Sequence, residues 1–363
     1  MTMARKRYTE WCKNELFTNE LVQAARLLQA ALNWHLMNLY RRLNFSDLLA
    51  EPKSPGELAE LLQFTDSAAI TIDAMLERLF SQYSFLEKSA VNGATRFRES
   101  DSPPMITHNL DDIRASMSEL GQDYLTALEF LQFGDDKVEY ALREDPEFLD
   151  RILSGREAEW EELWFRATNT DPLQNVHGIM GAVAIDKLFA SGAILEIGGG
   201  TGNGIRNLFS HLSDKNELDR VQQYIFTDIS QKFIMSTRRE IRADYPDVDT
   251  EWRFVDLNIP INQQKIGDGS IDLIYAVNAA HVAKDIIAFL RSCRKTLRPG
   301  GRVLFAERIR LREKDMAPRE LALNLSIYHR TAALRNEEHR PMHCYLSPKK
   351  LAQCARSGRL RRC

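Results

Sequence analysis

The stretch Ala193-Ile-Leu-Glu-Ile-Gly-Gly-Gly-Thr-Gly-Asn-Gly204 predicts a buried strand, a glycine-rich turn and the start of a helix. Its first three residues are apolar, as in a strand that is buried on both faces. Five glycines then fall within the seven positions 198–204, and the apolar residues of 205–212 recur at helical spacing. This order is typical of a nucleotide-binding sheet, in which glycines let the backbone approach a ligand closely.

The spacing of the glycines indicates which ligand they bind. The dinucleotide-binding pattern G-x-G-x-x-G fails at its last glycine in two registers, where Asn203 and Ile205 stand. A dehydrogenase is therefore the less favoured alternative. An acidic pattern, E-x-G-x-G-x-G, is complete in Glu196, Gly198, Gly200 and Gly202.

The acidic pattern resembles motif I of class I S-adenosylmethionine methyltransferases. A sulfonium cofactor carries a positive charge and an amino-acid tail, which favour a nearby carboxylate and an open backbone. A second acid, Asp228, ends the strand predicted at 224–228, where it is placed to hold both ribose hydroxyls. We therefore expect S-adenosylmethionine as the cofactor.

Strands and helices alternate regularly after residue 192. Further strands are predicted at 251–255, 271–277 and 302–307, with a helix at 285–297 and a turn at Arg298-Pro-Gly-Gly301. This pattern predicts a doubly wound, mostly parallel, Rossmann-like sheet with ligands at the carboxyl ends of its strands. Polar residues stand at those ends, and the expected cofactor-binding residues are Glu196, Gly198, Gly200, Gly202, Asp228, Ile229, Asp256, Leu257 and Asn278.

The N-terminal region is predicted to be helical and to end in a hairpin. A long amphipathic helix is expected at 18–40, a capping box at Ser54-Pro55-Gly56-Glu57, and a helix beginning at Thr65. Two short strands flank Asn92-Gly93, which completes a winged-helix pattern. The helix that would read DNA is acidic, so we expect dimerisation and a substrate lid rather than nucleic-acid binding.

We divide the chain into a winged-helix-like dimerisation domain (1–100), a helical linker and lid (101–178), and a cofactor-binding domain (179–363). Trp160, Trp164 and Phe165 either line a substrate cavity or belong to a core, and His177 either reaches the pocket or caps a helix. After a last helix at 349–356 the chain ends without the two strands that usually complete such a sheet, so we expect an exposed sheet edge.

His281 and Glu307 are the candidate catalytic residues. His281 follows the strand at 271–277 by a few residues, and Glu307 ends the neighbouring strand. A histidine oriented by a carboxylate is a suitable general base near neutral pH. The pair would remove the proton from the atom that receives the methyl group.

The same residues carry a more specific resemblance. Thr227-Asp-Ile-Ser230, Asp256-Leu257, Asn278-Ala-Ala-His281 and Leu297-Arg-Pro-Gly-Gly301 with Glu307 resemble the C-methyltransferase domains of polyketide synthases. That resemblance implies a His–Glu pair that forms a carbanion. Val282-Ala283 departs from the family's A-T at this point. The winged-helix front equally resembles small-molecule O-methyltransferases.

A third resemblance is to α-keto acid C-methyltransferases, which hold a metal near the keto acid. It implies His281 and His329 as ligands of a non-haem iron or another divalent metal. His339 and His343 have helical spacing, but Pro341 between them disfavours a ligand pair on one helix. Arg330, Arg335 and Arg340 either hold a substrate carboxylate or lie on a solvated face.

Composition sets the remaining expectations. The chain has 363 residues, a net charge of −3 and 44% hydrophobic residues, without an apolar run long enough for a membrane span. Five cysteines are scattered without a C-x-x-C motif, as in a reducing cytoplasm. We expect a cytoplasmic homodimer that methylates carbon of a small keto substrate, without nucleic-acid or membrane partners. The alternatives are an O-methyltransferase and a winged-helix regulator with a vestigial cofactor fold.

Overall fold

The computed structural model describes residues 8–101, 109–153, 158–310, 316–323 and 345–358. The chain forms two compact units, and each is built from separate stretches of sequence. The sheet unit contains the described parts of 1–19, 168–309 and 348–363, and the helical unit contains those of 20–167 and 310–347. The two units interleave along the chain. The division into three consecutive domains stays a prediction.

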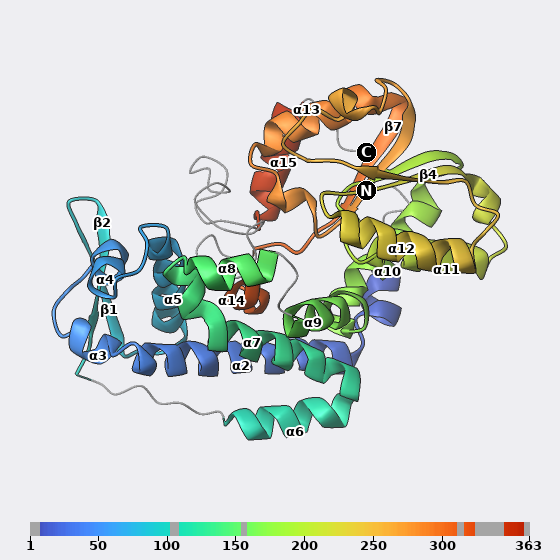
Figure 1. Cartoon of the computed structure of the whole chain (residues 1–363). Helices are drawn as coiled ribbons and strands as arrows, with labels where there is room; N and C mark the ends of the chain where they lie inside the picture. The colour runs from blue at the N-terminus through green and yellow to red at the C-terminus, as the bar shows by residue number, and fades with distance from the viewer. Residues whose placement is uncertain (1–7, 102–108, 154–157, 311–315, 324–344, 359–363) are drawn as a thin grey trace. The chain divides into compact units, whose positions relative to one another are not determined.

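The sheet unit is built on five parallel strands in the order β5-β4-β3-β6-β7 (Figure 1). The strands are β3 (Gly192–Glu196), β4 (Val221–Asp228), β5 (Thr250–Phe254), β6 (Ile271–Val277) and β7 (Leu297–Ala306). In this register Glu196 lies opposite Phe226 and Tyr275, and Asp228 lies opposite Phe254. The prediction of a parallel sheet with polar residues at its carboxyl edge is therefore confirmed.

Helices cover both faces of this sheet. Helices α10 (Pro172–Leu188), α11 (Asn203–Ser213) and α12 (Gln231–Asp244) share one buried cluster with β3, β4 and β6. The opposite face carries α13 (Ile286–Thr296) and α15 (Pro348–Ser357), which pack against each other (Figure 1). Coverage on both faces explains why the central strand β3 is buried along its whole length.

One boundary differs from the prediction. The turn expected at Arg298–Gly301 lies inside β7, which begins at Leu297. Leu297 pairs with Ile271 and Arg302 pairs with Leu273, so the residues between them form an irregularity in a continuous strand. Proline cannot donate to the ladder and Gly300 has φ +84°, which explains why pairing skips these residues without ending the strand.

The helical unit contains a long helix, shorter helices and a hairpin. Its elements are α2 (Asn19–Arg42), α3 (Phe45–Leu48), α4 (Pro55–Leu61), α5 (Ala68–Gln82), β1 (Leu86–Val91), β2 (Ala94–Glu99), α6 (Leu110–Leu120), α7 (Leu125–Leu142), α8 (Pro146–Leu153), α9 (Ala158–Asn169) and α14 (Pro318–Leu323). The last residues of α9, 168 and 169, fall in the sheet unit.

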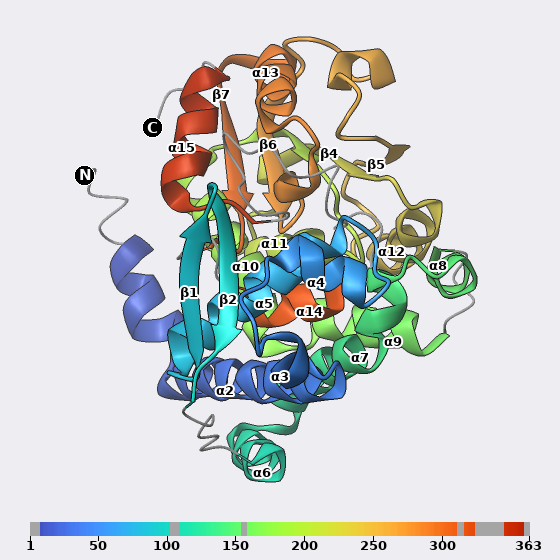
Figure 2. The ribbon, with the colours of Figure 1, turned by 90° about the vertical axis from the view of Figure 1, so that its left-hand side faces the viewer.

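Local signals in this unit are confirmed. Ser54 accepts a hydrogen bond from the Glu57 backbone N–H, and the Glu57 carboxylate accepts one from the Ser54 N–H. Val91 pairs with Ala94 around Asn92-Gly93, which closes the hairpin visible in Figure 2. Both turn residues have positive φ, as a two-residue hairpin turn requires.

The interior of the helical unit holds a buried polar pair. His35 Nδ1 and Asp135 Oδ2 are 2.8 Å apart, each side chain being 1% exposed, and Arg42 donates to the other carboxylate oxygen. On α5, Arg78 donates to Asn33 and Gln29 of α2 and is itself buried. The one basic residue of the helix that would contact DNA is thus used inside the unit.

The N-terminal residues belong to the sheet unit. Residues 8–11 are helical, and a π-helical turn follows at Cys12–Leu16. The Tyr8 hydroxyl donates to the carbonyl of Met180 on α10 at 3.1 Å, and burial raises the Tyr8 pKa well above its usual value. A segment more than 170 positions away in sequence therefore packs on α10.

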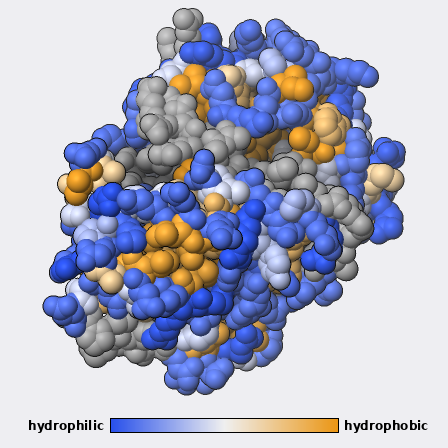
Figure 3. Space-filling view, turned by 60° about the vertical axis from the view of Figure 1, so that its left-hand side comes forward, coloured by the Kyte–Doolittle hydropathy of each residue, from blue (hydrophilic) through white to orange (hydrophobic). Residues whose placement is uncertain are grey.

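Within the described residues no helix is long and apolar enough to cross a bilayer. The face drawn in Figure 3 is largely hydrophilic, with apolar patches between charged side chains. Large exposed apolar side chains of the helical unit include Leu61, Phe80, Val91 and Tyr140. Dimerisation through this unit and its winged-helix role stay predictions.

Candidate functional site

The glycine loop after β3 shows open backbone on one side and close packing on the other. Gly198, Gly200 and Gly202 all have positive φ, a backbone conformation that residues with a side chain rarely adopt. A β-carbon on Gly198 would lie 2.6 Å from the Ala279 β-carbon, so the loop packs directly against the segment after β6. A β-carbon on Gly200 would meet nothing within 4 Å, so a ligand has access to the backbone there.

Asp228 is tied to this loop from the next strand. Its Oδ2 accepts from the Gly200 N–H at 2.9 Å, and its Oδ1 accepts from the Ser230 N–H at 2.7 Å. Burial raises the Asp228 pKa, while the two backbone donors act in the opposite direction. A carboxylate offers about four acceptor positions, so Asp228 retains capacity for hydroxyl donors of a ligand.

A polar network that the sequence did not reveal anchors the loop to α9, α10 and α11. The Asn175 oxygen accepts from the side-chain amides of Asn203 and Asn207, at 2.8 Å each. Thr201 contacts the hydroxyl of Thr168 and accepts from the Asn169 amide. Buried amides that satisfy one another rigidify a loop. Their only signal in the sequence was their polarity within apolar helices.

Glu196 lies away from the open side of the loop. It is fully buried beneath the start of α11, where it accepts from the Tyr224 hydroxyl at 2.8 Å. Its Oε1 has no partner among the described residues. Burial raises the Glu196 pKa to about 8. The structure thus gives Glu196 a supporting position, and direct contact with a cofactor stays a prediction.

Glu196 makes the stability of the ligand-free protein pH-dependent. Its folded-state pKa is raised above 4.5, the ordinary value of a glutamate, so the folded state binds more protons than the unfolded state between the two pKa values. The contribution is complete below about pH 4.5 and is lost as the pH rises towards 8. We expect the urea-unfolding free energy of the wild type, relative to Glu196→Gln, to fall across this window. A difference that is constant between pH 5 and 8 would contradict the raised pKa.

His281 and Glu307 meet at the carboxyl edge of β6 and β7. His281 Nδ1 lies 2.7 Å from Glu307 Oε2, with side chains 2% and 6% exposed. Glu307 Oε1 accepts from the backbone N–H groups of Ala279 and Ala280 at 2.9 and 2.7 Å. The carboxylate is therefore held by three contacts, and it orients the imidazole. The structure brings this predicted pair together.

Asn278 and Arg308 connect the same two strand ends. Asn278 has φ +49°, a conformation that asparagine tolerates better than most residues, and its Oδ1 accepts from the Arg308 N–H at 2.7 Å. Arg308 also reaches the Leu173 carbonyl and the Gln174 side chain of α10, at 3.4 and 3.3 Å. Sequence reasoning did not single out Arg308, although it directly follows Glu307.

The remaining predicted cofactor residues lie at the same edge. Ile229 follows Asp228 and is half-buried, as are Asp256 and Leu257 after β5. Asp256 Oδ1 accepts from both the backbone and the side chain of Asn258, which forms a tight turn there. These positions agree with the prediction in location, and their contact with a cofactor stays a prediction.

The metal prediction receives no support from the part of the chain that the structure describes. No group of three or more His, Cys, Asp or Glu side chains there is arranged to hold an ion. His281 and Glu307 are bound to each other, and the second predicted ligand, His329, lies outside the described residues. The same holds for Arg330, Arg335, His339, Arg340 and His343.

The other candidate residues have local roles. Trp160 is 7% exposed and packs on Phe130 and Phe133 in a core of the helical unit, joined by the half-buried Trp164, whereas Phe165 is exposed. This places Trp160 in a core. His177 Nδ1 lies 3.0 Å from the Gln174 carbonyl on α10.

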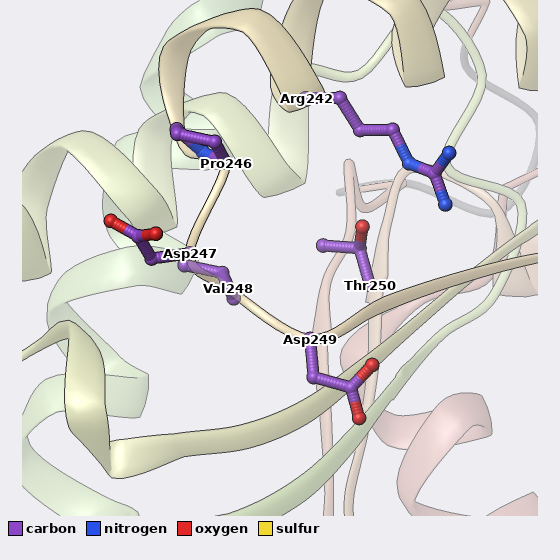
Figure 4. Close-up of a pocket in the computed structure, with 6 residues that line it drawn as sticks. All are labelled: Arg242, Pro246, Asp247, Val248, Asp249 and Thr250. Carbon is purple, nitrogen blue, oxygen red and sulfur yellow. The ribbon is translucent and has the colours of Figure 1, made fainter.

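A surface pocket elsewhere in the sheet unit is unrelated to these residues. Figure 4 shows its lining on the turn between α12 and β5, formed by Arg242, Pro246, Asp247, Val248, Asp249 and Thr250. Thr250 begins β5, whereas Asp228 and Asp256 stand at the carboxyl edge of the sheet. The pocket is therefore at the opposite edge.

Comparisons with known proteins agree with this geometry. Residues 195–303 match the family described as a methyltransferase domain. Prosolanapyrone synthase of Alternaria solani is 36% identical over 118 residues, which are 32% of this chain and 4% of that protein. Polyketide synthase PksM of Bacillus subtilis is 30% identical over 118 residues, 32% of this chain and 3% of that protein. The chain thus spans a small part of the length of these relatives.

Solved structures show the fold over nearly the whole chain. The crystal structure of CurJ carbon methyltransferase has a TM-score of 0.75 at 17% identity and covers 98% of this chain and 89% of its own. The citrinin polyketide synthase CMeT domain has a TM-score of 0.69 at 17% identity, with 98% and 88% covered. Residues 195–303 thus match the methyltransferase-domain family, and the chain has the fold of two solved carbon methyltransferases.

Proposed function

We propose that this chain transfers a methyl group from S-adenosylmethionine to a carbon atom of a small keto substrate, as a cytoplasmic enzyme of specialised metabolism. The observation that carries the proposal is the contact between His281 and Glu307. His281 follows Ala279 by two residues, and the glycine loop packs against Ala279 at Gly198. A carbon acid must lose a proton before it can accept a methyl group. An oriented histidine beside the cofactor loop supports that step.

The residues present fit the cofactor. Gly200 leaves open space beside its backbone, and Asp228 retains acceptor capacity for the ribose hydroxyls. When bound, S-adenosylmethionine supplies a methyl group on a positively charged sulfur, which acts as an electrophile. Asp228 and the backbone around Gly198–Gly202 would hold its nucleoside and amino-acid parts.

The chain's own residues would handle the proton. Nε2 of His281, on the ring edge away from Glu307, would take the proton from the carbon next to the substrate carbonyl. The electron pair of that C–H bond then moves into the enolate, with the negative charge on oxygen. Glu307 stabilises the imidazolium, since its carboxylate stays on Nδ1. The proton finally passes to solvent.

A labelled-methyl experiment tests this function. The protein is incubated with methyl-labelled S-adenosylmethionine and a panel of α-keto acids, β-keto thioesters and phenols, and the product is located by NMR. We expect the label on the carbon next to a carbonyl. When the substrate is deuterated at that carbon, the methylated product should have lost deuterium there. Label on phenolic oxygen would instead support an O-methyltransferase. No transfer, with salt-dependent binding to duplex DNA, would support the regulator.

A further inference from the structure

Two buried hydrogen-bond donors beside the His281–Glu307 pair have no acceptor. They are Nδ2 of Asn278 and Nε of Arg308, and neither atom has a partner among the described residues. A buried N–H that leaves water without gaining an acceptor destabilises the folded protein, and more so when it is charged. Such atoms in a site indicate a ligand oxygen that is not part of the protein.

The two donors belong to residues that are hydrogen-bonded to each other. Asn278 Oδ1 accepts from the Arg308 N–H at 2.7 Å, and the Asn278 N–H donates to the Ala306 carbonyl at 2.9 Å. Asn278 therefore presents its amide nitrogen on the other side of its carboxamide. Glu307, which lies between Ala306 and Arg308 in β7's continuation, is already engaged with Ala279, Ala280 and His281.

The charge of Arg308 is not compensated within the described part of the chain. Its Nη2 reaches two neutral oxygens of α10 at 3.3 and 3.4 Å, which are long for hydrogen bonds, and no described carboxylate pairs with it. The adjacent Glu307 is turned towards His281. A half-buried guanidinium without a counter-ion favours an anionic oxygen.

We propose that Asn278 and Arg308 bind the substrate's carbonyl oxygen and stabilise the negative charge that it gains when His281 removes the neighbouring proton. The proposal rests on the proposed function, and it names the ligand as an enolate oxygen. Fixed donors aimed at an oxygen where charge develops stabilise that charge without reorganisation. Asn278 then acts on the substrate, and not on the cofactor as the sequence suggested.

The binding of a stable enolate tests this assignment without turnover. A cyclic 1,3-diketone is an enolate anion at neutral pH, and its O-methyl enol ether is a neutral compound of similar shape. Both are titrated by calorimetry into the full chain saturated with S-adenosylhomocysteine. We expect the wild type to bind the enolate at least about tenfold more tightly than the ether, the range of a charged hydrogen bond.

Two variants and one control distinguish the effect of the two hydrogen-bond donors from that of the overall positive charge. Asn278→Asp keeps the acceptor for the Arg308 N–H and tolerates positive φ, but replaces the amide donor by an oxygen. Arg308→Gln removes the charge. We expect both to lose the preference for the enolate. Arg302→Gln, at an exposed arginine of β7, the strand that ends two residues before Arg308, should retain it, and melting temperatures report whether each variant is folded.

Defined outcomes overturn the proposal. It is wrong if the folded wild type shows no preference, or if folded Arg308→Gln retains it. It is also wrong if Arg308→Gln weakens S-adenosylhomocysteine binding as much as enolate binding, since Arg308 would then hold the cofactor carboxylate. Enolate preference without methyl transfer to any keto acceptor would contradict the proposed function and support this binding site, whereas transfer without preference would contradict this site alone.

Discussion

Replacing His281 by alanine is expected to slow methyl transfer by about 10²–10⁴-fold, the usual contribution of a positioned general base. The imidazole is 2% exposed and held by Glu307, so its loss removes the oriented base without altering the glycine loop. S-adenosylhomocysteine should therefore bind to the variant within about twofold of the wild type. Label transfer and calorimetry on the same protein measure both quantities.

Glu307→Gln and His211→Ala are the matched variants. Glutamine preserves the shape at 307, but its amide nitrogen cannot accept from the groups that the carboxylate now bonds, so the rate should fall as well. His211 lies on α11 and pairs with Asp186, away from the reacting groups, so its loss should leave the rate unchanged. An active His281→Ala enzyme would show that another residue removes the proton.

Asp228→Asn is expected to weaken cofactor binding by about 10- to 100-fold, which corresponds to the loss of a charged hydrogen bond. The wild-type carboxylate accepts from Gly200 and Ser230, and it orients the loop while it receives ligand hydroxyls. Asparagine has only one acceptor oxygen, so its amide group would face one of these N–H donors. Calorimetry with S-adenosylhomocysteine measures the effect.

Asp247→Asn makes the same chemical change at the other edge of the sheet. Asp247 lies on the turn before β5, in the surface pocket of Figure 4. Its substitution should leave cofactor affinity unaltered. If Asp228→Asn also bound the cofactor like the wild type, the ribose would have to be held elsewhere.

The sequence was sufficient to predict the sheet and to single out His281 and Glu307, whose side chains the structure brings into contact. Short apolar runs that end in a polar residue mark the carboxyl edge of a parallel sheet, and this signal located Asp228, Glu307 and Asn278, three residues before His281. The pattern does not depend on which face a side chain occupies. All parallel strands end at the same edge, so their terminal residues gather there.

The direction in which each side chain points could not be predicted from the sequence in the same way. The strand of Glu196 is covered on both faces, so polar and apolar residues do not alternate along it, and its burial beneath α11 had no sequence signal. Sequence analysis did not single out Arg308, because its environment depends on residues that lie near it only in the folded structure. An arginine is ordinarily solvent-exposed, and only the structure shows that its Nε is buried without an acceptor.

The hydrogen bond from the Tyr8 hydroxyl to the Met180 carbonyl links a helical segment near the start of the sequence to α10, 172 positions later. At a translation rate of about 5–20 residues per second, roughly 9 to 34 seconds separate the synthesis of Tyr8 from that of Met180. Contacts that span so much chain raise the contact order and slow folding. The sheet unit can therefore form its native contacts only after residues 168–309 have been made, and residues 20–167 lie in the loop between the first two of its three segments.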